Sequence, residues 1–165
     1  MPDDLSLQIP EINKILVKSN LNLLKKEGYE ADDIIATVVK KINQENLSIY
    51  IVTADKDIMQ LVNNRVFIYN PGNKFSGPII YDSKKVYEKW NVYPEKISDL
   101  LSIMGDNSDN IPGVKGIGPK TASKLINNFG DISALLENIE DIPNLRIKNL
   151  IKNQIEDIHL ASKLV

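Results

Sequence analysis

Cysteine is absent from the 165-residue sequence, and histidine and tryptophan each occur once. Without cysteine the chain forms no disulfide bonds, holds no zinc through thiolates and has no thiol nucleophile. The single histidine, His159, lies near the C-terminal end, and we expect it to be a surface or packing residue. Oxygen atoms are therefore the main source of metal ligands in this sequence.

An excess of positive charge and a long apolar run are also lacking. Lysine and arginine number 20 against 22 acidic residues, which gives a formal net charge of −2. Overall charge therefore gives no reason to expect nucleic-acid binding, and any such function must come from local clusters. The first residues are acidic where a secretory signal is basic, and no stretch is long enough to span a bilayer. We expect a soluble intracellular protein.

Hydrophobic periodicity indicates an α/β first half followed by an all-α second half. Helical spacing predicts helices over residues 5–26 and 31–43, the first stopping at Gly28. The predicted strands are 47–53, 66–69 and 79–81, with short helices over 56–62 and 83–90 between or after them. The strand over 47–53 shows no polar face, which is typical of a buried strand in a parallel sheet.

From Pro94 onward every predicted element is helical. The sequence therefore predicts two domains, an α/β part over residues 1–93 and a helical part over 94–165.

Seven carboxylates gather in three short stretches at the ends of predicted elements. The carboxyl ends of parallel strands are where α/β sheets bind ligands, and oxygen ligands suit Mg²⁺ or Mn²⁺. Two such ions activate water and stabilise negative charge during phosphoryl displacement. Helix capping and surface charge are the alternative interpretation, because acids also favour a helix N-terminus. The candidate ligands are Glu30, Asp32, Asp33, Asp55, Asp57, Asp106 and Asp109.

The third stretch also invites a calcium-loop interpretation, because Asp106, Ser108 and Asn110 alternate. That loop requires Gly at its sixth position and Glu at its twelfth, where this sequence has Ile111 and Ile117. The calcium loop is therefore excluded. Asp106 and Asp109, three residues apart, can still converge on one ion.

Residues 111–122 read I-P-G-V-K-G-I-G-P-K-T-A and precede a predicted amphipathic helix. Glycines let a backbone approach phosphate closely, and a helix N-terminus attracts anions. A dinucleotide fingerprint needs a preceding strand, which is missing here, and a plain helix–turn–helix remains the alternative. We expect contacts with a DNA backbone that do not read its sequence. The candidate DNA-binding residues are Gly113, Val114, Lys115, Gly116, Gly118, Lys120, Thr121 and Lys124.

The ordered strings E-A-D-D, T-A-D-K-D and G-D-x-S-D-N-I-P-G-V-x-G-I-G-x-K-T-A resemble the flap-endonuclease-like 5′ nucleases. They are most similar to the 5′–3′ exonuclease domain of bacterial DNA polymerase I, and the resemblance runs from Pro2 to Val165. It implies a partial PIN-like parallel sheet, followed by an all-α helix–hairpin–helix subdomain that grips duplex DNA and that in this family can hold K⁺. It also implies hydrolysis of DNA and RNA-primer phosphodiesters at 5′ ends and flaps, during replication and repair at the bacterial nucleoid. All seven carboxylates then correspond to ligands of two Mg²⁺ or Mn²⁺ ions, with Glu30, Asp32, Asp55 and Asp57 catalytic.

The resemblance begins midway through the family's fold. Family members start with a strand that carries a metal-binding Asp and continue into a helical arch, and neither is found here. We therefore expect an excised, split or truncated product with weak or no cleavage alone. A DNA polymerase, attached or separate, is an expected partner, as is self-association through an exposed apolar edge along 47–53. The alternative function is a non-catalytic duplex-DNA-binding module that uses the hairpin.

Overall fold

The structure, a computed structural model, describes residues 3–42 and 46–165. The chain divides into two compact units, Met1–Asn43 and Gln44–Val165, and each is described by itself below. Within the described ranges no helix is both long and apolar enough to cross a membrane.

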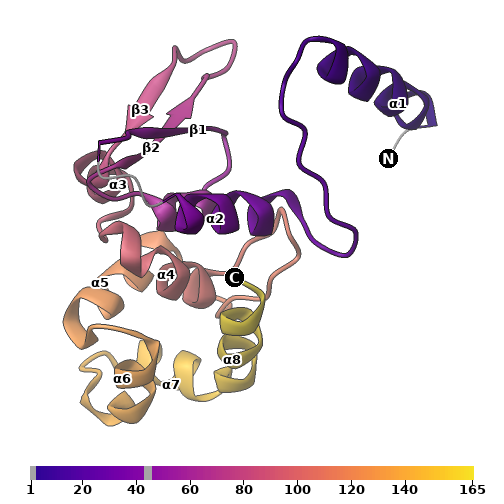
Figure 1. The fold of residues 1–165 in the computed structure, drawn as a ribbon. Coiled ribbons are helices and arrows are strands. Elements are labelled where there is room, and N and C mark those ends of the chain that lie inside the picture. The colour runs from indigo at the N-terminus through magenta and orange to yellow at the C-terminus, as the bar shows by residue number, and fades with distance from the viewer. Residues whose placement is uncertain (1–2, 43–45) are drawn as a thin grey trace. The chain divides into compact units, whose positions relative to one another are not determined.

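The first unit contains helices α1 (Asp3–Lys18) and α2 (Ala31–Lys41) (Figure 1). The sequence predicted that the first helix would run to residue 26, and that prediction is wrong for its last turns. The helix ends because Asn20 adopts a left-handed conformation with φ of 57°, a common C-terminal stop. None of this unit's described residues is buried, so its helices present apolar side chains without enclosing a core.

The described part of the second unit has a three-stranded sheet in the order β1 (Ile49–Val52), β2 (Val66–Asn70) and β3 (Ile79–Tyr81). β1 runs parallel to β2, with Ile49 opposite Val66, as the sequence predicted for a parallel pair. β3 is antiparallel to β2, so the sheet is mixed. One face of the sheet is buried, through Ile51, Val66, Ile68 and Tyr81.

The other face of β1 is open, although the sequence predicted a buried strand. Tyr50 is 54% exposed and Val52 is 69% exposed, and the Tyr50 ring stacks on Phe67 with centroids 5.3 Å apart. β1 pairs with β2 on one side and with no described strand on the other. The prediction of burial is therefore wrong for this face, and the exposed edge that the resemblance implied is present.

Helices form the rest of the second unit and pack around α4 (Ile97–Met104). Leu100, Leu101 and Ile103 of α4 are buried where α5 (Pro119–Phe129) and α8 (Ile155–Leu164) cover it (Figure 1). The other described elements are α3 (Ser83–Trp90), α6 (Ile132–Glu137), α7 (Leu145–Lys152) and the 3₁₀ turns η1 (Asp57–Leu61), η2 (Pro94–Lys96) and η3 (Ile139–Asp141).

Candidate metal centre and nucleic-acid interface

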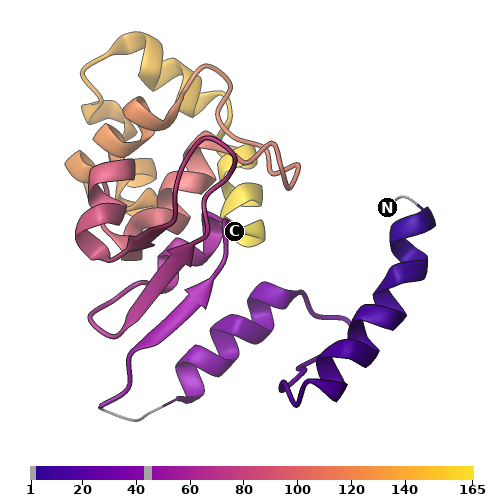
Figure 2. The same cartoon turned by 90° about the horizontal axis from the view of Figure 1, so that it is seen from above.

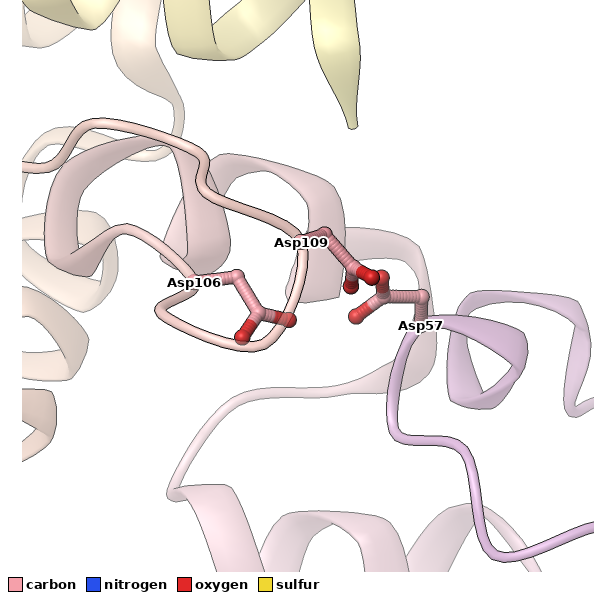
Figure 3. Close-up of side chains that lie close together, drawn as sticks. All are labelled: Asp57, Asp106 and Asp109. Carbon is pink, nitrogen blue, oxygen red and sulfur yellow. The ribbon is translucent and has the colours of Figure 1, made fainter. Parts of the chain in front are cut away.

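Three carboxylates converge where β1 gives way to η1 and α4 gives way to a loop. Asp57, at the start of η1, meets Asp106 and Asp109 of the loop, and one oxygen from each lies within 4.8 Å of the others. Figure 3 shows the Asp57 and Asp109 side chains extending toward each other, with Asp106 beside them. The sequence placed these residues in separate stretches, and the fold brings them together.

Side-chain capping of the turn after β1 positions Asp57. The Thr53 hydroxyl accepts the Asp55 N–H at 3.0 Å, and Asp55 Oδ1 in turn accepts the Asp57 N–H at 3.0 Å. One Asp55 oxygen is therefore bound to backbone, and Asp55 stands outside the group of three carboxylates. The two predicted ligands of this stretch thus have different local roles, since Asp55 caps the turn and Asp57 projects into the centre.

The acidic loop is closed at its neck by two glycines. Gly105 adopts a φ of 73°, and a Cβ on Gly113 would lie 2.3 Å from the Gly105 nitrogen. Asp106 and Ile111 exchange two backbone hydrogen bonds, at 3.0 and 2.8 Å, just inside this neck. A side chain at either glycine would force the two backbone segments apart. Gly113, predicted to approach phosphate, thus already makes a close backbone contact that shapes the acidic loop.

Lys56 contacts the carboxylate centre, and the sequence alone did not single it out. Its ammonium forms an ion pair with Asp106 and donates a hydrogen bond to the Ser108 hydroxyl at 3.1 Å. Ser108 donates both its N–H and its hydroxyl to Asp106 Oδ1, at 2.9 and 2.5 Å. The signal was present in the sequence, because Lys56 stands between two predicted ligands, Asp55 and Asp57.

The three carboxylates titrate differently because their neighbours differ. Burial, followed by the charge of Asp55, raises the pKa of Asp57 to about 6. Burial also acts to raise the pKa of Asp106, but hydrogen bonds from Lys56 and Ser108 outweigh it and lower that pKa to about 2. Loss of solvation and the charge of Asp106 raise the pKa of Asp109. The centre therefore holds more negative charge than Lys56 alone compensates.

A divalent cation fits this donor set. Asp57 Oδ1 is buried and has no hydrogen-bond partner among the described residues, an arrangement that costs free energy unless a donor or a cation meets it. All three side chains offer hard carboxylate oxygens, the ligands that Mg²⁺ and Mn²⁺ prefer.

The predicted ligands of the first unit cap a helix. Glu30 is the N-cap of α2, and Asp33 Oδ2 accepts the Glu30 N–H at 3.1 Å in a capping box. Asp32 stands in the first turn of the same helix. The capping interpretation thus describes the observed hydrogen bond of Asp33, and the metal role of all three residues stays a prediction.

The glycine segment forms a tight turn ahead of α5. Val114 and Ile117 are buried beneath it, and the Val114 N–H binds the Ile103 carbonyl at 2.8 Å. Gly116 adopts a φ of 93°, and Gly118 is the N-cap of α5. The turn therefore hides its apolar side chains, whereas Lys115 of the turn and Lys120 and Lys124 of α5 are exposed.

Gln154 fixes this turn from the start of α8, a contact that sequence reasoning missed. Its Oε1 accepts the Lys115 N–H at 2.8 Å, and its amide nitrogen donates to the Leu150 carbonyl at 3.2 Å. The Lys115 N–H is therefore already engaged, so a phosphate would meet the Lys115 side chain and the neighbouring backbone.

Two family models of known proteins together match the whole chain. Residues 1–91 match the 5′–3′ exonuclease N-terminal resolvase-like domain, and residues 92–165 match the 5′–3′ exonuclease C-terminal SAM fold. The 5′–3′ exonuclease of Aquifex aeolicus is 38% identical over 164 residues, 99% of this chain and 54% of that protein. The thermostable DNA polymerase I of Thermus thermophilus is 37% identical over 163 residues, 99% of this chain and 19% of that protein.

Among solved structures, the T5 5′-exonuclease with bound divalent zinc superposes with a TM-score of 0.77 at 25% identity. The match covers 99% of this chain and 62% of that one. This chain thus spans about half the length of the Aquifex relative and somewhat more of the T5 protein. With both domain matches and the converging carboxylates in place, the chain belongs to the 5′–3′ exonuclease family.

Proposed function

We propose that this chain contributes to metal-dependent hydrolysis of DNA and RNA-primer phosphodiesters at 5′ ends and 5′ flaps. The observation that carries the proposal is the convergence of carboxylate oxygens from Asp57, Asp106 and Asp109 within 4.8 Å, in a chain of this family. Such a cluster at the end of a strand suits hard cations, and phosphoryl transfer is the chemistry that such cations assist.

Mg²⁺ or Mn²⁺ is the cation we propose for this centre, held by Asp57, Asp106 and Asp109. When bound, such an ion lowers the pKa of water and stabilises negative charge on the phosphate. The zinc-bound T5 5′-exonuclease supports a divalent ion in this fold. Asp57 must be deprotonated to bind a cation, and Lys56 must share Asp106 with it. Glu30, Asp32, Asp33 and Asp55 are the further ligands that the family resemblance implies for a two-ion centre.

DNA is the substrate we propose for the exposed lysines of the glycine segment and of the first turns of α5. Lys115, Lys120 and Lys124 present positive charge beside the N-terminus of α5, where backbone N–H groups also favour phosphate. Contacts of this kind bind the backbone of any sequence, which suits a nuclease that recognises ends and flaps. A K⁺ ion at this turn and a polymerase partner belong to the same proposal.

Cleavage of a labelled 5′-flap DNA in Mg²⁺ tests the proposal. Asp57→Asn and Asp106→Asn should each lower the rate at least about 100-fold, because each removes a charged ligand. Asp141→Asn, an exposed acid elsewhere in the helical half, is the matched control and should cleave like the unmodified chain. Undiminished cleavage by Asp57→Asn would refute the proposed centre.

A non-catalytic duplex-DNA-binding module is the second candidate, and one observation favours it. The glycine turn is held by buried Val114 and Ile117 and by the hydrogen bond between Lys115 and Gln154, all of them far in the sequence from the carboxylates Asp55 and Asp57. For such a module we expect salt-sensitive binding of duplex DNA. Its affinity should be unchanged in Asp57→Asn and lower in the double variant Lys115→Ala, Lys120→Ala. Loss of binding in both sets of variants would instead favour the metal-dependent nuclease.

A further inference from the structure

Phe75 lies in the connection between β2 and β3 and is the most exposed large apolar side chain among the described residues. It is 97% exposed, so its whole ring faces solvent. Lys74 beside it is also exposed, as are Ser76 and Gly77. A lone aromatic ring held out in this way has too little area for a stable protein–protein interface.

Local hydrogen bonds between side-chain oxygens and backbone N–H groups hold the connection that carries Phe75. Asn73 Oδ1 accepts the N–H of Phe75 at 2.8 Å and that of Ser76 at 3.1 Å. Asn70 Oδ1 accepts the Gly72 N–H at 2.8 Å. Gly72 has a φ of 78°, and a Cβ there would lie 2.3 Å from the Ser76 carbonyl oxygen, so only glycine fits. The backbone under Phe75 is thus ordered before any partner binds, which lowers the entropic cost of using the ring.

Strand direction places this connection on the same sheet edge as the carboxylates. β1 and β2 are parallel, and the Thr53 N–H that follows β1 bonds to the Tyr69 carbonyl near the end of β2. Asp55 and Asp57 follow the end of β1, and the Phe75 connection follows the end of β2. Figure 2 shows both segments leaving the sheet at its carboxyl end. The connection that carries Phe75 and the segment that carries Asp57 therefore leave the sheet from the same edge, the edge at which we propose that nucleic acid binds.

We propose that Phe75 stacks on an unpaired base of the nucleic acid whose backbone lies at the carboxylate centre, with Lys74 beside a neighbouring phosphate. The proposal rests on the proposed function, because it takes nucleic acid as the ligand of this sheet edge. Aromatic rings stack on any base through the base's π-face, so the contact adds affinity for single-stranded segments without sequence preference. A base inside a duplex has no free face to offer, so Phe75 distinguishes unpaired strand from duplex.

The test is a comparison of affinities for two DNAs in Ca²⁺, measured by fluorescence anisotropy. One DNA is a blunt duplex, and the other is the same duplex with a single-stranded 5′ extension. Phe75→Ala should weaken binding of the extended DNA about tenfold and leave the blunt duplex unchanged. Phe75→Trp should restore the affinity, and Phe75→Leu should not, because stacking needs a ring. Leu145→Ala, another strongly exposed apolar side chain, is the matched control and should bind both DNAs like the unmodified chain.

Phe75→Trp also gives a direct readout, because a stacked base quenches indole fluorescence. The extended DNA should quench this variant well beyond the unmodified chain, which contains only Trp90. An unchanged affinity ratio in Phe75→Ala, or equal binding by the Leu and Trp variants, would overturn the proposal. A loss of self-association in Phe75→Ala with unchanged DNA binding would assign the ring to a protein contact and overturn it as well.

These results are separate from those that test the proposed function. The Phe75 variants are compared by their affinities for two DNAs, under conditions without cleavage. The proposed metal centre is tested by the cleavage rates of Asp57→Asn and Asp106→Asn. If Phe75→Ala leaves the ratio of the two DNA affinities unchanged while cleavage still depends on the metal, only the proposed stacking contact is refuted.

Discussion

Lys56, between two acids on the turn after β1, forms an ion pair with Asp106 on the loop after α4. The Asp106 side chain is only 4% exposed, so this lysine is the cation that compensates a buried negative charge. Burying an uncompensated carboxylate is costly, whereas a paired and hydrogen-bonded one is tolerated. The chain therefore carries its own counter-ion at the place where we propose that a divalent cation binds.

Replacing Lys56 should destabilise the metal-free chain. We expect Lys56→Met to lower the free energy of unfolding by about 2 kcal/mol, because Asp106 is left buried without its cation. Urea denaturation in EDTA measures this loss, and saturating Mg²⁺ should recover part of it. Lys84→Met is the matched control, since Lys84 forms an exposed pair with Glu88. Equal stabilities of the two variants in EDTA would contradict this role of Lys56.

Removing the charge of Asp57 should have the opposite effect on stability. Its pKa of about 6 lies above the ordinary 3.8, so the folded chain binds the proton more tightly than the unfolded chain does. At pH 7 the charged form is therefore disfavoured by folding, and Asp57→Asn should stabilise the metal-free chain by about 1 kcal/mol. The same variant should lose divalent-metal binding by calorimetry. A destabilised Asp57→Asn chain would contradict the crowding of negative charge at this centre.

The same shift sets a pH dependence for stability and for metal binding. Between about pH 4 and pH 6 the folded state holds more protons at Asp57 than the unfolded state, so this residue's contribution lowers stability as pH rises. Asp106 acts in the other direction, because its pKa of about 2 makes its contribution fall only below about pH 4. Mn²⁺ affinity should rise from pH 5 to pH 7 with release of about one proton. A flat affinity profile in that range would exclude titration of Asp57.

The neck of the acidic loop should not tolerate a side chain. We expect Gly113→Ala to cost about 2 kcal/mol or more, because its Cβ would collide with the backbone of Met104 and Gly105. Metal binding should weaken too, since the collision displaces Asp106 relative to Asp57. Gly77→Ala is the control, because nothing lies within 4 Å of a Cβ at that position. Thermal unfolding compares the two variants, and equal midpoints would show that the neck yields without strain.

Periodicity and capping made much of the fold predictable from the sequence. The helix over 31–41 follows the 3.6 period, and α3 begins beside Asp82, whose carboxylate accepts the Lys85 N–H at 2.8 Å. The end of α1 was not predictable in this way, because apolar residues continue past the point where Asn20 turns the backbone. The exposed face of β1 was also missed from strand composition, since an apolar strand reads the same whether or not another layer covers it.

The sequence indicated which residues belong to the candidate site better than it indicated the contacts between them. Acids at element ends indicated Asp57, Asp106 and Asp109, and the fold brings them together. The different role of Asp55 depends on one turn hydrogen bond, and the ion pair of Lys56 joins segments distant in the sequence. Neither contact produces a periodic pattern in the sequence, so both could be recognised only in the three-dimensional structure.

Anomalous diffraction from crystals of this chain soaked in Mn²⁺ shows directly whether the three converging carboxylates hold a divalent cation. We expect an anomalous peak in contact with the carboxylates of Asp57, Asp106 and Asp109, and its loss in Asp57→Asn crystals soaked identically. A site without Mn²⁺ in the unmodified chain, or a peak that persists unchanged in Asp57→Asn, would contradict the proposed metal centre.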